Sequence, residues 1–123
     1  MAKVMLVDDD KQILDFLTQH FENRGDEVIQ AEDGKAAVSM AASEKPDLIV
    51  LDMNMPVKTG WEVARELKAE GAPTSGIPII ALTAHKTADD HDEAHEAGCD
   101  AFVEKPIDPE RLLETVDRLL KRG

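Results

Sequence analysis

Side chains that can bind a metal or a phosphoryl group stand at the ends of four short apolar runs. The runs are residues 4–7, 48–51, 79–82 and 101–103, and the polar residues just beyond them are Asp8 with Asp9, Asp52, Thr83 and Lys105. Such runs, separated by helical patterns, are typical of parallel strands buried on both faces. Ligands bind beyond the carboxyl ends of these strands. We therefore expect three carboxylates, a hydroxyl and an ammonium to meet at one edge, where they suit a divalent metal and a phosphoryl group.

The three aspartates would repel one another at this edge. Two unit charges about 5 Å apart cost about 3 kcal/mol at an effective dielectric constant of about 20. Lys105 is one compensating charge, and a hard cation is the other, because all-oxygen ligands favour Mg²⁺ or Mn²⁺. Aspartate is also a known type of phosphoryl acceptor. We expect Asp52, which stands alone after a central strand, to be the acceptor, while Asp8 and Asp9 hold the metal.

Length, charge and cysteine content narrow the class of protein. A chain of 123 residues predicts one domain, spanning 1–123. A net charge of -12 disfavours direct binding to nucleic acid or to an anionic membrane. No apolar stretch approaches the roughly 20 residues that span a bilayer, and the first strand begins too early for a signal peptide. The single cysteine, Cys99, cannot form an internal disulfide and is expected to pack before the last strand, so we expect a cytoplasmic protein.

Apolar residues between the runs are spaced for helices. The first helix would end near Gly25 and bury a stripe formed by Ile13, Leu14, Leu17 and Phe21. Residues 27–31 are less apolar and predict an edge strand. A second helix would follow Asp33 and bury the side formed by Ala37, Val38, Ala41 and Ala42. The third, from about residue 60 to 69, would pack through Trp61, Ala64 and Leu67.

The last two helical segments differ in the apolar surface that they offer. The segment from about 88 to 97 has only alanines as apolar residues, so it would bury little area and be among the least stable elements. The last helix would begin at Asp108 and Pro109, a favoured N-cap followed by proline. Five strands alternating with five helices predict an α/β fold with a parallel sheet between two layers of helices.

The chain resembles, over its whole length, the receiver domain of two-component response regulators. The marks of the family fall in order along the chain: Asp8-Asp9, Asp52, Asn54-Met55-Pro56 followed by Gly60, Thr83-Ala84, and Lys105-Pro106. Each mark is weak alone, but all of them in order at strand ends make a specific signature. The resemblance implies the (βα)5 flavodoxin-like fold, a five-stranded parallel sheet with strand order 2-1-3-4-5.

The resemblance also implies how the site would work. Asp9 and Asp52 would bind Mg²⁺ directly and Asp8 mostly through water, with the backbone carbonyl of Asn54 as a further ligand. Asp52 would take a phosphoryl group from a phosphohistidine on a histidine kinase or a histidine phosphotransferase. Lys105 would pair with the phosphoryl oxygens. The Lys105-Pro106 peptide bond would be cis, an isomer that proline makes accessible.

The resemblance also implies a conformational switch that is controlled by phosphorylation. Thr83, followed by Ala84, would move toward the phosphoryl oxygens and open a space into which Phe102 rotates. The surface that changes would comprise the helix near 88–97, the last strand and the last helix, in a monomer or a weak phosphorylation-dependent dimer. The alternative for Phe102 is plain core packing. His85 and Asn54 would flank the site and tune the lifetime of the acyl phosphate.

Two other functions compete with a signalling receiver. An aspartyl-phosphate phosphatase or mutase would want an acidic residue two positions after the nucleophile, and this chain has Asn54 there. A degenerate receiver acting as a constitutive binding module would not need the intact set of Asp9, Asp52, Thr83 and Lys105. Both features favour the signalling receiver. Rather than act as an enzyme, it would phosphorylate itself from small donors in the presence of Mg²⁺ and then dephosphorylate itself.

Overall fold

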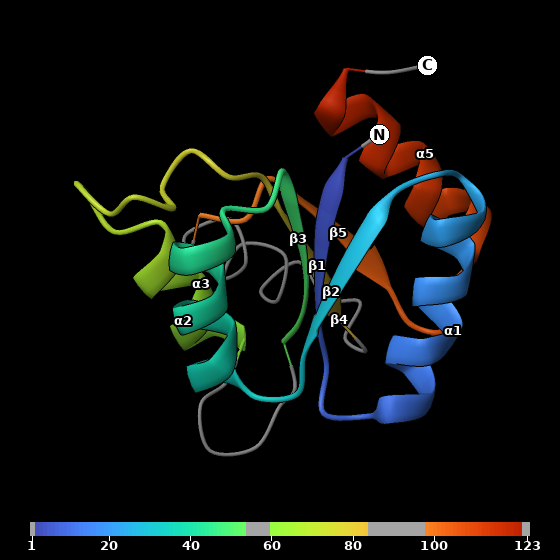
Figure 1. Cartoon of the computed structure of the whole chain (residues 1–123), viewed down its shortest axis with the longest axis horizontal. Helices are drawn as coiled ribbons and strands as arrows, with labels where there is room; N and C mark the ends of the chain where they lie inside the picture. Colours follow the sequence, from blue (N-terminus) through green and yellow to red (C-terminus); the bar gives the residue numbers. More distant parts are fainter. Residues whose placement is uncertain (1, 54–59, 84–97, 122–123) are drawn as a thin grey trace.

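The computed structural model describes residues 2–53, 60–83 and 98–121, and its centre is a five-stranded parallel sheet. The strands lie in the order β2-β1-β3-β4-β5, which confirms the predicted topology (Figure 1). Their bounds are Lys3–Val7 for β1, Glu27–Ala31 for β2, Leu48–Asp52 for β3, Ile79–Thr83 for β4 and Ala101–Glu104 for β5. The less apolar strand β2 lies at one edge, as its composition predicted.

Helices cover both faces of the sheet, so the apolar runs of β1, β3 and β4 are buried on both sides. Helices α1 and α5 lie on one face, and α2 and α3 lie on the other (Figure 1). Their bounds are Lys11–Asn23 for α1, Gly34–Glu44 for α2, Gly60–Leu67 for α3 and Pro109–Leu120 for α5. None of the helices in the part of the chain that the structure describes is long and apolar enough to cross a membrane.

Aspartates begin three of these helices. Asp10, Asp33 and Asp108 are the N-cap residues of α1, α2 and α5, and each side chain accepts a hydrogen bond from a backbone N–H of the first turn. This satisfies donors that the helix itself leaves unpaired. Because Asp10 caps α1, Asp8 and Asp9 remain available for other chemistry.

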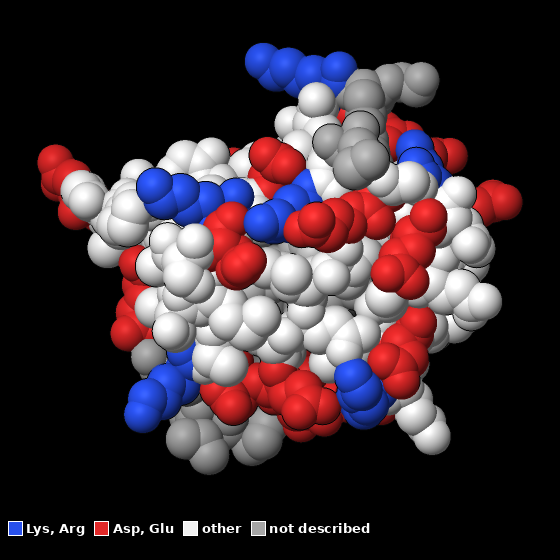
Figure 2. Space-filling model, in the orientation of Figure 1, with Lys and Arg blue, Asp and Glu red and all other residues white. Residues whose placement is uncertain are grey.

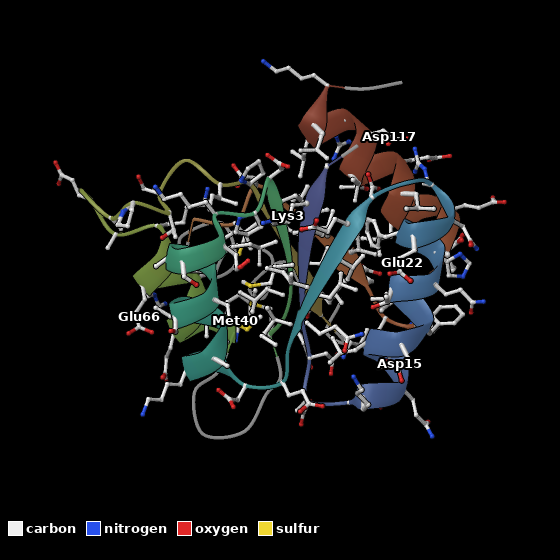
Figure 3. All side chains as sticks on the ribbon, in the orientation of Figure 1. Lys3, Asp15, Glu22, Met40, Glu66 and Asp117 are labelled. Atoms are coloured by element: carbon white, nitrogen blue, oxygen red, sulfur yellow. The ribbon has the colours of Figure 1, made fainter. Side chains whose placement is uncertain are left out.

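Two predictions about the helices need correction. Ala42 is exposed, while Met40 packs against the core on the sheet side of α2 (Figure 3). Ala42 lies about 100° around the helix from the buried Ala41, which takes it off the inner face. Helix α3 ends at Leu67 rather than near residue 69. At this end the buried Thr74 hydroxyl donates a hydrogen bond to the Leu67 carbonyl at 2.7 Å. Trp61 is partly buried and packs against the core, as predicted, while the predicted helix near 88–97 lies outside the described residues.

Candidate functional site

Three carboxylates meet at the carboxyl edge of the sheet. Asp8, Asp9 and Asp52 each offer an oxygen, and these oxygens all lie within 4.8 Å of one another. Strands β1 and β3 are neighbours paired in register through Val7 and Leu51, so the residues that follow them emerge side by side. Asp8 and Asp52 are each only 2% exposed, whereas Asp9 is exposed. The cluster therefore has two buried members and one that faces solvent.

Lys105 brings a positive charge to the buried pair. Its Nζ lies 3.2 Å from Oδ1 of Asp52 and 3.9 Å from Oδ2 of Asp8. The backbone N–H of Lys105 donates to the Thr83 carbonyl at 2.7 Å, and the Lys105-Pro106 peptide bond is cis, as the resemblance implied. The buried Thr83 ends β4, next to β3, in which Asp52 pairs with Leu82. The topology thus places all five predicted polar groups at the ends of neighbouring strands.

Asp8 is the electrostatically perturbed member of the cluster. Its Oδ1 accepts the backbone N–H of Asp10 at 2.9 Å, while its buried Oδ2 has no hydrogen bond within the described ranges. Burial, together with the smaller effect of the Asp52 charge, raises the pKa of Asp8 to about 6 against the opposing effects of the Asp10 N–H and Lys105. A buried carboxylate oxygen without a donor, beside two more carboxylates, fits a hard divalent cation such as Mg²⁺.

The raised pKa of Asp8 predicts how stability depends on pH. In metal-free protein Asp8 binds a proton more tightly when folded, with a pKa of about 6 against 3.8 for the unfolded chain. The stability present below pH 4 is therefore lost as the pH rises through 6, by about 3 kcal/mol from this residue. Urea unfolding in EDTA between pH 4 and 7 measures this loss. In Asp8→Asn the decline over this window should flatten, and an unchanged decline would assign it to another group.

Saturating Mg²⁺ should reverse this trend. The cation binds the ionised carboxylates, so the stabilisation that it gives must grow as Asp8 loses its proton. Repeating the unfolding series with Mg²⁺ measures that gain. A gain that is the same at pH 4 and pH 7 would show that the cation binds elsewhere.

The structure explains why position 60 is a glycine, which the sequence motif alone did not explain. A Cβ at this position would lie 2.5 Å from Cα of Met53 and against the backbone carbonyl oxygen of Asp52. The backbone N–H of Gly60 also donates to the Met53 carbonyl at 3.3 Å. The first turn of α3 therefore packs directly on the backbone that holds the Asp52 side chain, and only glycine leaves room for this approach.

Phe102 points away from the core. Its side chain is 37% exposed on the edge strand β5, which makes the core-packing alternative wrong. Cys99 is buried just before this strand, as predicted, and burial raises the pKa of its thiol to about 12. Asn54, Ala84 and His85, which were assigned to the metal site, the switch and lifetime tuning, lie outside the described residues.

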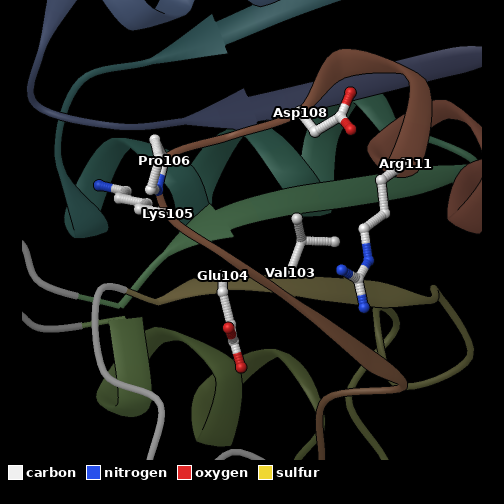
Figure 4. Close-up of a pocket in the computed structure, with 6 residues that line it drawn as sticks. All are labelled: Val103, Glu104, Lys105, Pro106, Asp108 and Arg111. Atoms are coloured by element: carbon white, nitrogen blue, oxygen red, sulfur yellow. The ribbon is translucent and has the colours of Figure 1, made fainter.

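A hollow of about 270 Å³ lies along β5 and the start of α5, lined by Val103, Glu104, Lys105, Pro106, Asp108 and Arg111. Figure 4 shows the Lys105 side chain pointing away from Asp108 and Arg111. The Lys105 ammonium belongs instead to the pair with Asp52. This hollow is therefore a neighbour of the carboxylate site and does not contain it.

The carboxyl edge of the sheet is acidic beyond the cluster. Acidic side chains gather along the bottom of the face in Figure 2, where β1 and β2 end. The exposed carboxylates that follow these two strands are Asp9, Asp10, Glu32 and Asp33. This rim favours a cation at the site and disfavours a free polyanion.

Fold and site together define a phosphoacceptor domain, in which a parallel sheet holds aspartates and a lysine at its carboxyl edge. The family model of the response regulator receiver domain matches residues 4–117. The chain belongs to this family, and receiver domains are the phosphoacceptor modules of two-component signalling.

Comparison with proteins of similar sequence agrees with this assignment. The chain is 35% identical to protein PilH of Pseudomonas aeruginosa, over 98% of both chains. It is also 35% identical to the response regulator MprA of Mycolicibacterium vanbaalenii, over 98% of this chain but 51% of MprA. The chain therefore spans about half of MprA and nearly all of PilH.

Solved structures match the fold closely. The chemotaxis protein CheY4 of Vibrio cholerae superposes with a TM-score of 0.90 at 34% identity, covering 97% of this chain and 98% of that one. The receiver domain of a sensor histidine kinase from Pseudomonas aeruginosa has a magnesium ion coordinated in its active-site cleft. It matches with a TM-score of 0.88 at 28% identity, over 98% of both chains.

Proposed function

We propose that Asp52 accepts a phosphoryl group from a phosphohistidine on a histidine kinase or a histidine phosphotransferase. The observation that supports this most directly is the position of Asp52. It is 2% exposed at the end of the central strand β3, with the ammonium of Lys105 at 3.2 Å from Oδ1. Asp9 is exposed, and Oδ1 of Asp8 accepts the Asp10 N–H, so neither is placed as well for this role.

In the proposed transfer a carboxylate oxygen of Asp52 bonds to phosphorus as the bond from phosphorus to the histidine nitrogen breaks. The departing imidazole keeps the electron pair of the broken bond and takes a proton from solvent. Lys105 stays protonated and moves from Asp52 to a phosphoryl oxygen, and the Thr83 hydroxyl donates to another. Such transfer depends mainly on positioning and on neutralising charge. The product is an acyl phosphate.

A divalent cation completes the charge balance. Asp8, Asp9 and Asp52, with the backbone carbonyl of Asn54, would hold Mg²⁺ or Mn²⁺. When bound, the cation neutralises negative charge on the phosphoryl oxygens. The domain would thus phosphorylate itself from small donors and later lose the group by hydrolysis, without turning over a separate substrate.

We further propose that phosphorylation changes the surface formed by the segment near 88–97, β5 and α5. Thr83, with Ala84, would move toward the phosphoryl group, and Phe102 would turn inward. The 37% exposure of Phe102 supports this, because an outward ring has an inward position left to take. In this proposal residues 1–123 act as one receiver domain in the cytoplasm, as a monomer or a weak phosphorylation-dependent dimer.

The test is incubation with Mg²⁺ and phosphoramidate, followed by intact-mass measurement. A single lasting adduct, mapped to Asp52 by borohydride reduction and peptide sequencing, is the expected result. Rapid turnover of the donor without a lasting adduct would favour a phosphatase or mutase, against which Asn54 argues. No adduct at all would favour a constitutive binding module and would end the proposal.

The lifetime of the adduct gives a separate prediction. Replacing Asn54 or His85 by alanine should change the rate at which the acyl phosphate hydrolyses, because both residues stand two positions after site residues in the sequence. Mg²⁺ affinity should stay nearly the same, since neither side chain is among the proposed ligands. Intact mass followed over time measures the lifetime, and an unchanged lifetime in both variants would remove these residues from the site.

A further inference from the structure

A charged side chain joins the end of α3 to the start of β5, at the edge of the sheet formed by the amino ends of the strands. The Lys68 ammonium lies 3.0 Å from Oδ2 of Asp100 and also donates to the Ser75 carbonyl at 3.3 Å. The same oxygen of Asp100 accepts the backbone N–H of Ile79 at 2.9 Å, and the Asp100 N–H donates to the Ile79 carbonyl at 2.9 Å. We call Lys68 and Asp100, with these bonds, the Lys68 clasp.

The clasp is tightly packed as well as paired. The Lys68 side chain is only 16% exposed, and a Cβ at Gly98 would lie 2.8 Å from Cγ of Lys68. Gly98 also has a φ of +96°, which a glycine adopts without strain. Cys99, between Gly98 and Asp100, is 5% exposed. A side chain from the end of α3 therefore covers the residues through which the chain enters β5.

Strand β5 needs such an anchor because its own packing is slight. It has four residues, lies at the edge of the sheet and pairs there with β4. Among its side chains only those of Ala101 and Val103 are buried. The register of a strand is weakly specified where few apolar side chains fix it. The reciprocal bonds between Asp100 and Ile79 therefore fix the register of β5 at its amino end.

We propose that the Lys68 clasp positions Lys105 for the phosphoryl transfer to Asp52. This inference rests on the proposed function of Asp52, and it makes Lys68 a positioning residue that itself touches neither the metal nor the phosphoryl group. Lys105 follows β5 directly, five residues after Asp100. A displacement of β5 along β4 therefore carries the Lys105 backbone with it.

The site tolerates little displacement of Lys105. Its Nζ lies 3.2 Å from Oδ1 of Asp52 and 3.9 Å from Oδ2 of Asp8. A slip of one residue would move the strand by about 3.3 Å, which is as long as the shorter of these distances. A misplacement of about 1 Å at a reacting group can cost about a hundredfold in rate. Loosening at the amino end of a strand only about 13 Å long would therefore reach the site.

The experiment compares Lys68→Met with a matched control, Lys3→Met, in the full chain. Methionine keeps an apolar stem over Gly98 but removes the charge. Lys3 lies at the same edge of the sheet, with its Nζ 3.5 Å from Glu27 and 3.7 Å from Glu44, but on β1, which has a neighbouring strand on both sides. Lys68→Met should slow adduct formation from phosphoramidate about tenfold, whereas Lys3→Met should keep the wild-type rate. Mg²⁺ affinity should stay the same in both, because the proposed metal ligands follow β1 and β3.

Alkylation of Cys99 measures the opening of the clasp independently of phosphorylation. Burial raises the pKa of this thiol to about 12, and the charge of Lys68 opposes the rise. Removing that charge alone would raise the pKa further and slow alkylation, because the thiolate is the reactive form. Faster alkylation by iodoacetamide in folded Lys68→Met, by about tenfold, would therefore come from local opening. Lys3→Met should react as slowly as the wild type.

A double variant tests whether the effect passes through Lys105. Lys105→Met sets the rate that remains without the ammonium. In that background Lys68→Met should not slow the reaction further, because no ammonium is left to misplace. The alkylation of Cys99 should still be faster in the double variant. A protein that was merely destabilised would lose the same factor in both backgrounds.

Asp100→Asn provides a second route to the same test if Lys68→Met does not fold. Its amide oxygen can still accept the Ile79 N–H, but the charge that pairs with Lys68 is gone. This variant should show the same fall in the phosphoramidate rate, which is again absent when Lys105 is methionine. A wild-type rate in Asp100→Asn would overturn the inference.

Four other outcomes would also overturn it. They are a wild-type rate in Lys68→Met, an equal loss in Lys3→Met, an equal factor lost in the Lys105→Met background, and a loss of Mg²⁺ affinity in parallel with the rate. A wild type that phosphoramidate does not phosphorylate would refute the proposed function of Asp52 itself. The alkylation of Cys99 would still measure the clasp in that case, which keeps the two failures distinct.

Discussion

Asp52→Asn is expected to abolish the phosphoryl adduct while the domain stays folded. The amide is not a nucleophile, so the rate of adduct formation from phosphoramidate should fall by more than about 10³-fold, the scale seen when a covalent nucleophile is removed. Lys105 keeps Asp8 as a partner at 3.9 Å, which limits the electrostatic cost of the change. Intact mass measures the adduct, and thermal unfolding shows that the fold is retained.

A second measurement tests whether the loss of the adduct comes from removing one charge of the carboxylate cluster. The charge of Asp52 helps to raise the pKa of Asp8, so in Asp52→Asn the pKa of Asp8 should fall toward its ordinary value. The loss of stability between pH 4 and 6 should shrink with it. A variant that lost the adduct without this shift would indicate damage to the fold rather than removal of one charge from the cluster.

Asp33→Asn is the matched control for Asp52→Asn. Asp33 is an exposed carboxylate at the same edge of the sheet, and its Oδ1 accepts the Ala36 N–H at 2.7 Å. Asparagine caps a helix about as well as aspartate does, so this variant should keep both its stability and its adduct. An adduct that persists in Asp52→Asn would move the acceptor to Asp8 or Asp9.

The parallel sheet and the meeting of its polar residues were predictable from the sequence because one physical rule links them. Buried parallel strands need continuous apolar runs, and the residues that follow such runs share an edge. This was enough to bring Asp8, Asp9, Asp52 and Lys105 together. The raised pKa of Asp8 was not predictable, because it depends on burial to 2% exposure and on how close the charge of Asp52 lies.

The apolar groove beside Lys105 was not predicted either, although the sequence contained a sign of it. Phe16 falls outside the stripe of Leu14, Leu17 and Phe21 that α1 buries, and a large aromatic residue on the outer side of a helix is a candidate contact residue. Its neighbours Pro106 and Ile107 come from a loop some ninety positions later in the chain. Helical periodicity describes one element at a time and cannot pair α1 with that loop.

Gly60→Ala is expected to lower both the stability of the domain and the rate at which Asp52 is phosphorylated. The added methyl group would meet the backbone carbonyl of Asp52 and Cα of Met53, at 2.5 Å from the latter. Both obstacles are backbone atoms, so relief requires moving α3 or the end of β3. Overpacking of this kind should lower the free energy of unfolding by about 2–4 kcal/mol, even though alanine favours helix by about 1 kcal/mol over glycine. Urea unfolding measures this decrease in the free energy of unfolding.

Gly76→Ala separates the clash from the general effect of removing a glycine. Nothing lies within 4 Å of a Cβ at Gly76, so alanine there should be neutral or should stabilise by up to about 1 kcal/mol through the unfolded chain. Its rate with phosphoramidate should match the wild type, whereas in Gly60→Ala the carboxylate of Asp52 shifts relative to Lys105 and the rate falls. Equal stability of the two variants would mean that α3 moves without cost. A normal rate in a destabilised Gly60→Ala would mean that the position of Asp52 does not depend on α3.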